Sequence, residues 1–148
     1  CLTLPEVTQT VIFTRLSERT QMPEGESLTA LAAHGCTLCI FLSIERIESV
    51  AAHLAEAGWA QTAPVVVVHK ATWPGEELVL RGTLEDIAAR CREAGVERQA
   101  LILVSPALGA RARTSSQPSK LYDPAFPRRF RPAREDGPAD ADRGADAA

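Results

Sequence analysis

The chain has no excess of positive charge and no long apolar run. Its 148 residues include 16 Lys and Arg against 19 Asp and Glu, and the net charge of -3 favours neither nucleic acid nor an anionic membrane as a partner. No stretch reaches the roughly 18 apolar residues of a membrane-spanning helix, and the amino terminus lacks a basic region followed by an apolar one. We therefore expect a cytoplasmic protein without nucleic-acid or membrane partners.

Cysteines are too few and too scattered for the disulfide framework of a secreted domain. Among the four, only Cys36 and Cys39 have Cys-x-x-Cys spacing. They lie in an apolar segment that predicts a strand, where residues three apart point to opposite faces of the sheet. Because no second Cys or His pair completes a tetrahedral set, we expect these thiols to pack in the core and the chain to hold no metal.

Familiar catalytic motifs are also missing. The chain has no glycine-rich dinucleotide or phosphate loop, no Gly-x-Ser-x-Gly and no His-Glu-x-x-His. Its histidines, His34, His53 and His69, have no identifiable partner in the sequence, so surface or structural roles are expected. Glu76 and Glu77 adjoin a predicted turn and are expected to be solvated.

Three apolar runs predict strands that are covered on both faces, as in an α/β layer. They are residues 39–42, 65–68 and 101–104, and β-branched or alternating segments at 7–16 and 77–82 add two more strands. Amphipathic segments between them predict helices, at residues 27–34, from Ser43 to Gly58 and from Thr83 to Gly95. Ser43 is the expected N-cap of the second helix, and Thr83 with Asp86 the expected capping box of the third.

Alternation of strands and helices predicts an α/β fold, a three-layer sandwich with a mixed sheet flanked by helices. The sheet is expected to be mixed because "WPGEE" has Pro and Gly in turn positions and indicates a hairpin-like connection. We assign residues 1–108 to this domain and 109–131 to a carboxyl-terminal extension. Residues 132–148, a mixture of Ala, Asp, Gly and Pro, are expected to be a disordered tail.

Strand ends are the expected place for a ligand, because open α/β sheets bind ligands beyond the carboxyl ends of their strands. Two such ends are residues 42–43 and 69–74. The small Ala71 would let a flat ligand approach the backbone, and Thr72 beside it offers a hydroxyl. The alternative is a plain strand exit in which Trp73 covers the edge of the core.

Five separated segments together resemble the carboxyl-terminal part of the tetrapyrrole methylase family, in its branch of the cobalamin pathway. In order they are "LTLPEVTQTVIFTRL", "TLCIFLS", "KATWPGEELVLRGTLEDIA", "RQALILVSPAL" and "SKLYDPAFPRRFR", within residues 2–131. The resemblance implies two α/β domains with the active site between them, of which this chain is the second. The glycine-rich segments of the family's first domain do not occur here, so we expect a fragment.

The resemblance implies methyl transfer from S-adenosyl-L-methionine to a carbon of a reduced tetrapyrrole, with no metal. It assigns backbone contacts with the adenosyl group to Leu42 and to Ala71, with Thr72 beside Ala71. It leaves Arg15 and Lys70 as candidates for binding the acidic side chains of the substrate. It also implies a homodimer. Two alternatives stay open: a non-catalytic dimerisation or ligand-binding module derived from the family, and a methylase acting on another tetrapyrrole position.

Overall fold

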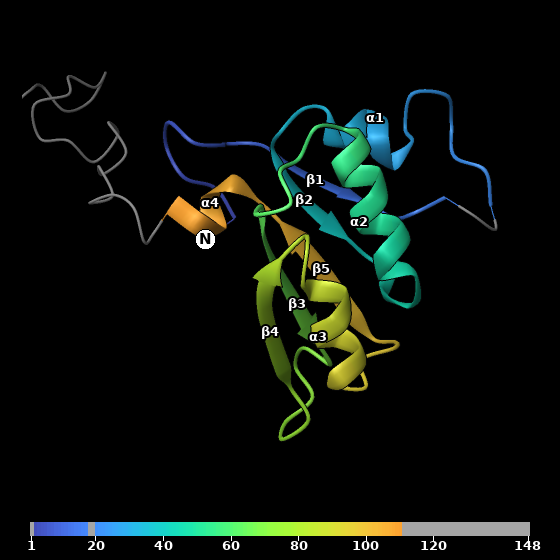
Figure 1. Cartoon of the computed structure of the whole chain (residues 1–148), viewed down its shortest axis with the longest axis vertical. Helices are drawn as coiled ribbons and strands as arrows, with labels where there is room; N and C mark the ends of the chain where they lie inside the picture. Colours follow the sequence, from blue (N-terminus) through green and yellow to red (C-terminus); the bar gives the residue numbers. More distant parts are fainter. Residues whose placement is uncertain (1, 18–19, 111–148) are drawn as a thin grey trace, which may run out of the picture. The chain divides into compact units, whose positions relative to one another are not determined.

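A five-stranded mixed sheet with helices forms the part of the chain that the computed structural model describes, residues 2–17 and 20–110 (Figure 1). Its elements in chain order are β1 (Val11–Thr14), α1 (Leu28–Ala32), β2 (Thr37–Ile40), the 3-10 turn η1 (Ile44–Arg46), α2 (Ile47–Glu56), β3 (Pro64–His69), β4 (Leu78–Thr83), α3 (Ile87–Glu93), β5 (Ala100–Val104) and α4 (Pro106–Ala110). The predicted α/β class and mixed sheet with flanking helices are confirmed. The expected disordered tail, and the expected extension beyond Ala110, lie outside the described residues.

The strands are arranged in the order β1-β2-β5-β3-β4. Strands β1 and β2 are parallel, whereas β5 runs antiparallel to both β2 and β3, and β4 runs antiparallel to β3. Consequently the carboxyl ends of β1, β2 and β3 and the beginnings of β4 and β5 share one edge of the sheet. We call it the carboxyl edge; it lies toward the bottom of Figure 1.

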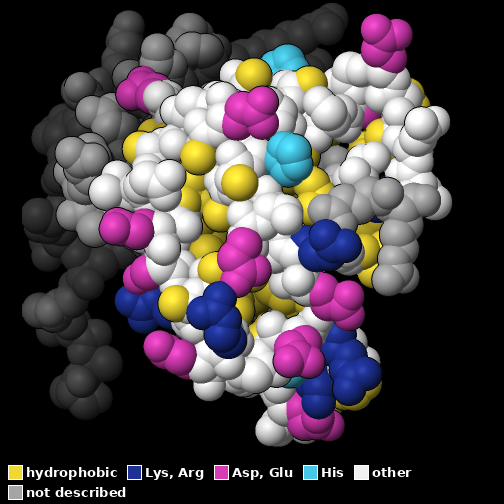
Figure 2. All heavy atoms as spheres, turned by 45° about the vertical axis from the view of Figure 1, so that its right-hand side comes forward, with side chains coloured by type: hydrophobic (Ala, Val, Ile, Leu, Met, Phe, Trp, Pro, Cys, Tyr) yellow, Lys and Arg dark blue, Asp and Glu magenta, His cyan; other side chains and the backbone are white. Residues whose placement is uncertain are grey.

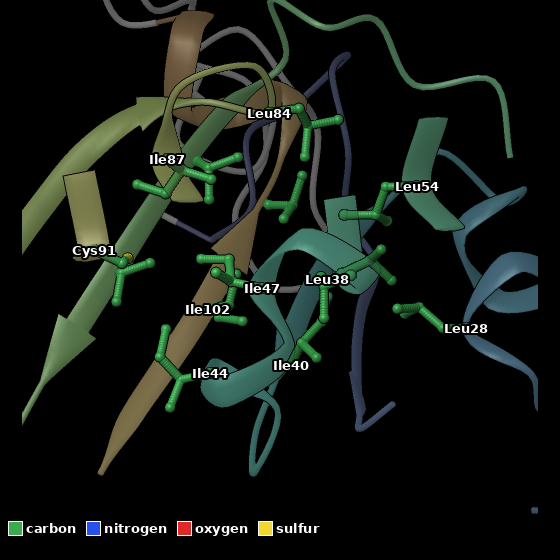
Figure 3. Packing of buried hydrophobic residues seen from close by; sticks show 14 of the residues in the cluster. Leu28, Leu38, Ile40, Ile44, Ile47, Leu54, Leu84, Ile87, Cys91 and Ile102 are labelled. Atoms are coloured by element: carbon green, nitrogen blue, oxygen red, sulfur yellow. The ribbon is translucent and has the colours of Figure 1, made fainter. Parts of the chain in front are cut away.

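One face of the sheet packs against the helices and holds the core. Alternate residues of the three inner strands point to this face, and each is at most 1% exposed: Leu38, Ile40, Val65, Val67, Ile102 and Val104. Buried side chains of the helices meet them, as Figure 3 shows for Ile47 and Leu54. Since burial of one such side chain stabilises by about 1.5–3 kcal/mol, this cluster determines which face of each strand turns inward.

The opposite face is covered by described residues only toward one end. There the Thr37 hydroxyl donates to the Leu2 carbonyl at 2.6 Å and also contacts the Ser105 hydroxyl, while α4 lies against Pro64. Farther along, large apolar side chains are open to solvent, with Phe13 68% and Val79 48% exposed. Figure 1 accordingly shows α1, α2 and α3 together on a single side of the sheet.

Two of the three predicted helix starts differ from the sequence interpretation, whereas Ser27 caps α1 at the predicted start of the first helix. Ser43 does occupy the cap position before η1, but its side chain makes no capping hydrogen bond. Thr83 is the last residue of β4 rather than a helix cap, and α3 begins only at Ile87. One bond of the predicted capping box is nevertheless present, because the Asp86 carboxylate accepts the Thr83 amide at 2.7 Å. Asp86 also pairs with Arg90, whose hydrogen bond is the main reason that the pKa of Asp86 lies below its usual value.

The cysteines Cys36, Cys39 and Cys91 are buried, and burial raises the pKa of the Cys39 and Cys91 thiols. Within the described residues, no three His, Cys, Asp or Glu side chains are grouped as a metal site would require. The same residues contain no helix that is long and apolar enough to span a membrane.

Candidate functional site

The carboxyl edge carries an unusual concentration of left-handed backbone. Five non-glycine residues in the described part have positive φ, and four of them lie at this edge: Leu42 at 53°, Lys70 at 47°, Thr72 at 68° and Gln99 at 54°. A bulky or β-branched residue in this region is strained, commonly by about 1–3 kcal/mol, and such strain tends to occur at ligand sites. The strained backbone therefore lies at the same edge of the sheet at which the sequence predicts a ligand.

Leu42 ends the segment that follows β2, and its side chain is 85% exposed. It lines a pocket of about 400 Å³ together with Arg15, Ser43 and Arg46, among others. That volume lies within the range of small-molecule sites. The structure thus brings two of the predicted residues, Leu42 and Arg15, into one pocket.

Ala71 and Thr72 lie in the loop between β3 and β4, residues 70–77, which is folded into tight turns. The Trp73 amide donates to the Lys70 carbonyl at 3.0 Å, and the Glu76 amide donates to the Trp73 carbonyl at the same distance. The Thr72 amide donates to the Glu77 carboxylate, also at 3.0 Å. Glu77 is therefore a partner of a predicted site residue and not simply a solvated charge.

Lys70 is held by the same loop. Its ammonium group pairs with the Glu76 carboxylate and lies 5.3 Å from the centre of the Trp73 ring. It also lines a second pocket, of about 360 Å³, with Arg98 and Gln99. Figure 2 shows Lys and Arg side chains next to Asp and Glu side chains toward the bottom of the view, the end at which this loop lies in Figure 1.

The two halves of the predicted cofactor contact are separated by one strand. Leu42 follows β2 and Ala71 follows β3, with β5 between them. Two strand spacings amount to about 10 Å, a distance that a flat nucleoside can span. Thr72 lies beside Ala71 on the exposed turn, and Lys70 lines the second pocket.

Backbone groups at these two positions are available to a ligand. Within residues 2–17 and 20–110, the amide and carbonyl of Leu42 and of Ala71 make no hydrogen bond, and both residues are exposed. A nucleobase and ribose need such donors and acceptors. The adenosyl contact predicted for these residues requires such groups, and that contact stays a prediction.

Several residues of this edge escaped the sequence interpretation. The backbone carbonyl of Gln99 accepts a hydrogen bond from the Lys70 amide at 2.8 Å. Gln99 also lines the second pocket, together with Arg98. Both precede β5, and they reach this edge only because β5 runs antiparallel to β3, which the apolar pattern does not reveal. Arg46 lines the first pocket, and in the sequence it appeared only as one residue of a helix.

Comparison with known proteins shows to which family this chain is similar. The family model of the tetrapyrrole (corrin/porphyrin) methylases matches residues 1–88. The cobalt-precorrin-4 C(11)-methyltransferase of Priestia megaterium is 46% identical over 130 residues, which is 88% of this chain and 50% of that protein. The chain therefore spans about half the length of this curated relative.

Solved structures agree with the sequence comparison. The X-ray structure of a cobalt precorrin-4 methyltransferase matches with a TM-score of 0.69 and 48% identity, over 72% of this chain and 44% of that one. The uroporphyrin-III C-methyltransferase of Thermus thermophilus, solved with S-adenosyl homocysteine, shares the fold with a TM-score of 0.57 at 22% identity, over 73% of this chain and 47% of that one. This chain belongs to the tetrapyrrole methylase family.

Proposed function

We propose that this chain supplies the second domain of a precorrin-4 C11-methyltransferase of cobalamin biosynthesis. The whole enzyme would transfer a methyl group from S-adenosyl-L-methionine to C11 of precorrin-4 or of cobalt-precorrin-4. The observation that carries the proposal is the 46% identity to a cobalt-precorrin-4 C(11)-methyltransferase over 88% of this chain. The exposed backbone at Leu42 and Ala71 supports it, because it lies where the family resemblance puts the adenosyl group.

S-adenosyl-L-methionine supplies an activated methyl group on a sulfonium, so its transfer to a nucleophilic carbon needs no covalent enzyme intermediate. The task left to the protein is to align the methyl group with the accepting carbon and to exclude water. In this chain, Leu42 and Ala71 would hold the adenosyl group through the backbone. Thr72 would add its hydroxyl.

Binding of S-adenosylhomocysteine tests the cofactor assignment, with titration calorimetry on the chain. Replacement of Ala71 by leucine fills the space that the adenosyl group would occupy, so we expect binding to weaken at least about tenfold. Ala60→Leu is the matched control, since Ala60 is also exposed but precedes β3 at the opposite edge of the sheet. Equal loss of binding in both variants would contradict the assignment.

Arg15 and Lys70 are the proposed contacts for the carboxylates of the tetrapyrrole. Arg15 lines the pocket of Leu42, and Lys70 lines the pocket on the far side of β5. Arg15→Gln and Lys70→Gln should each weaken binding of uroporphyrin III, a stable tetrapyrrole polycarboxylate, as measured by fluorescence quenching. Arg92→Gln on α3 is the control, because Arg92 pairs with Glu48 away from both pockets.

The homodimer implied by the resemblance and the cytoplasmic location expected from the composition remain predictions. Sedimentation velocity on the chain tests the first of them. A single species with the mass of one chain at all concentrations would rule the homodimer out for this part of the protein.

A further inference from the structure

Ser43 has a role that neither helix capping nor solvent exposure explains. The residue is only 3% exposed, and its side chain makes no hydrogen bond to the first turn of η1. The hydroxyl instead donates to the Phe41 carbonyl at 2.8 Å and accepts the Leu16 amide at 2.8 Å. A single buried oxygen thus joins the chain after β1 to the chain after β2.

The first of these hydrogen bonds spans Leu42. Phe41 and Ser43 are its neighbours in the chain, and the bond between them closes a tight loop in which Leu42 has a φ of 53°. Left-handed backbone of this kind costs an L-residue about 1–2 kcal/mol, so it persists only where surrounding contacts enforce it. The Ser43 hydroxyl supplies one such contact directly beside the strained residue.

The hydrogen bond from the Leu16 amide to Ser43 joins two chain segments that line the pocket. Leu16 follows Arg15, and the bond from the Leu16 amide to Ser43 brings the chain after β1 beside Leu42. The pocket of about 400 Å³ is lined by Arg15, Leu16, Leu42 and Ser43, among others. The Ser43 hydroxyl thus joins the two chain segments of the pocket by a direct hydrogen bond.

We propose that Ser43 is a positioning residue, which orients the backbone of Leu42 toward the ligand and holds the Arg15 segment beside it. The positioning itself follows from the contacts of Ser43. Only the identity of the ligand, an S-adenosyl compound, rests on the proposed function.

The test compares Ser43→Ala with Ser27→Ala in the full chain. Ser27 is a matched control, because its hydroxyl also accepts one backbone amide, that of Ala30 at 3.2 Å, but it caps α1 and does not line the pocket. Two readouts are needed: nuclear magnetic resonance of the Leu42 and Leu16 amides, and calorimetry with S-adenosylhomocysteine. The unfolding free energy of each variant is measured alongside, because a purely structural role would lower it without affecting the two readouts selectively.

For Ser43→Ala we expect three changes that Ser27→Ala does not produce. First, the nuclear Overhauser effect between the amide and α protons of Leu42 weakens; this effect is strong when φ is positive. Second, the Leu16 amide exchanges its hydrogen at least about tenfold faster relative to the core amides. Binding of S-adenosylhomocysteine weakens about tenfold. An unchanged Leu42 signal and unchanged Leu16 exchange in Ser43→Ala would overturn the proposal. If the wild-type chain does not bind S-adenosylhomocysteine, the cofactor assignment fails for the isolated chain, while the resonance readout still decides the role of Ser43.

Discussion

Replacement of Leu42 by glycine should stabilise the fold, although it removes a large apolar side chain. The residue is 85% exposed, so loss of its side chain removes little buried apolar surface. The φ of 53° costs an L-residue about 1–2 kcal/mol, and glycine adopts this region without that penalty. Glycine also gains about 0.5–1 kcal/mol of conformational freedom in the unfolded chain, which offsets part of the gain.

The net expectation for Leu42→Gly is an increase of about 0.5–1 kcal/mol in the free energy of unfolding relative to Leu42→Ala. Alanine is the proper reference, because it removes the same exposed atoms but keeps the Cβ that makes positive φ unfavourable. Leu42→Ala itself should lie within about 0.5 kcal/mol of the wild type, as surface substitutions usually do.

Urea unfolding, followed by circular dichroism, measures the difference. With a slope of about 1.5 kcal/mol per molar urea, the midpoint of Leu42→Gly should lie roughly 0.3–0.7 M above that of Leu42→Ala. A midpoint at or below that of the alanine variant would refute the reasoning, since it would mean that Leu42 does not hold a strained backbone. The glycine variant should nevertheless bind S-adenosylhomocysteine more weakly, because a freer backbone is less preorganised for the ligand.

Three further predictions concern other parts of the chain. Glu77→Ala should speed hydrogen exchange of the Thr72 amide at least about tenfold, while the unfolding free energy changes by less than about 0.5 kcal/mol, because the bond is exposed. Ile102→Ala, in the fully buried centre of β5, should lower the unfolding free energy by about 2–5 kcal/mol in urea titrations. Asp86 has a lowered folded-state pKa, so its ionised form stabilises the fold above the usual aspartate pKa, and this stabilisation is lost as the pH falls through the folded value. The difference in stability between wild type and Asp86→Asn should therefore be present near pH 6 and shrink below about pH 4, in thermal unfolding across that range.

Local patterns predicted most of the secondary structure correctly, because periodicity depends only on nearby residues. The apolar run at Val65–Val68 lies in β3, and the helix expected after Ser43 ends as predicted before Gly58, which has a φ of 93°. The turn signal in "WPGEE" likewise predicted the antiparallel pairing of β3 with β4. Two helix starts were predicted less well. The Ser43 hydroxyl accepts the Leu16 amide, which lies far away in the chain, instead of capping a helix. Thr83 does bond to Asp86, but it is still the last residue of β4, and the helix begins four residues later.

The sequence by itself determined the alternation of strands and helices, the apolar core and the two strand ends that carry Leu42 and Ala71. Only the tertiary structure decided the direction of β5, which brings Gln99 to the carboxyl edge and separates the two predicted contacts by one strand. It also decided that the Ser43 hydroxyl joins two chain segments 27 residues apart. The physical reason is that side-chain period and turn chemistry act within a few residues, whereas strand order and buried hydrogen bonds depend on which distant segments the core brings together.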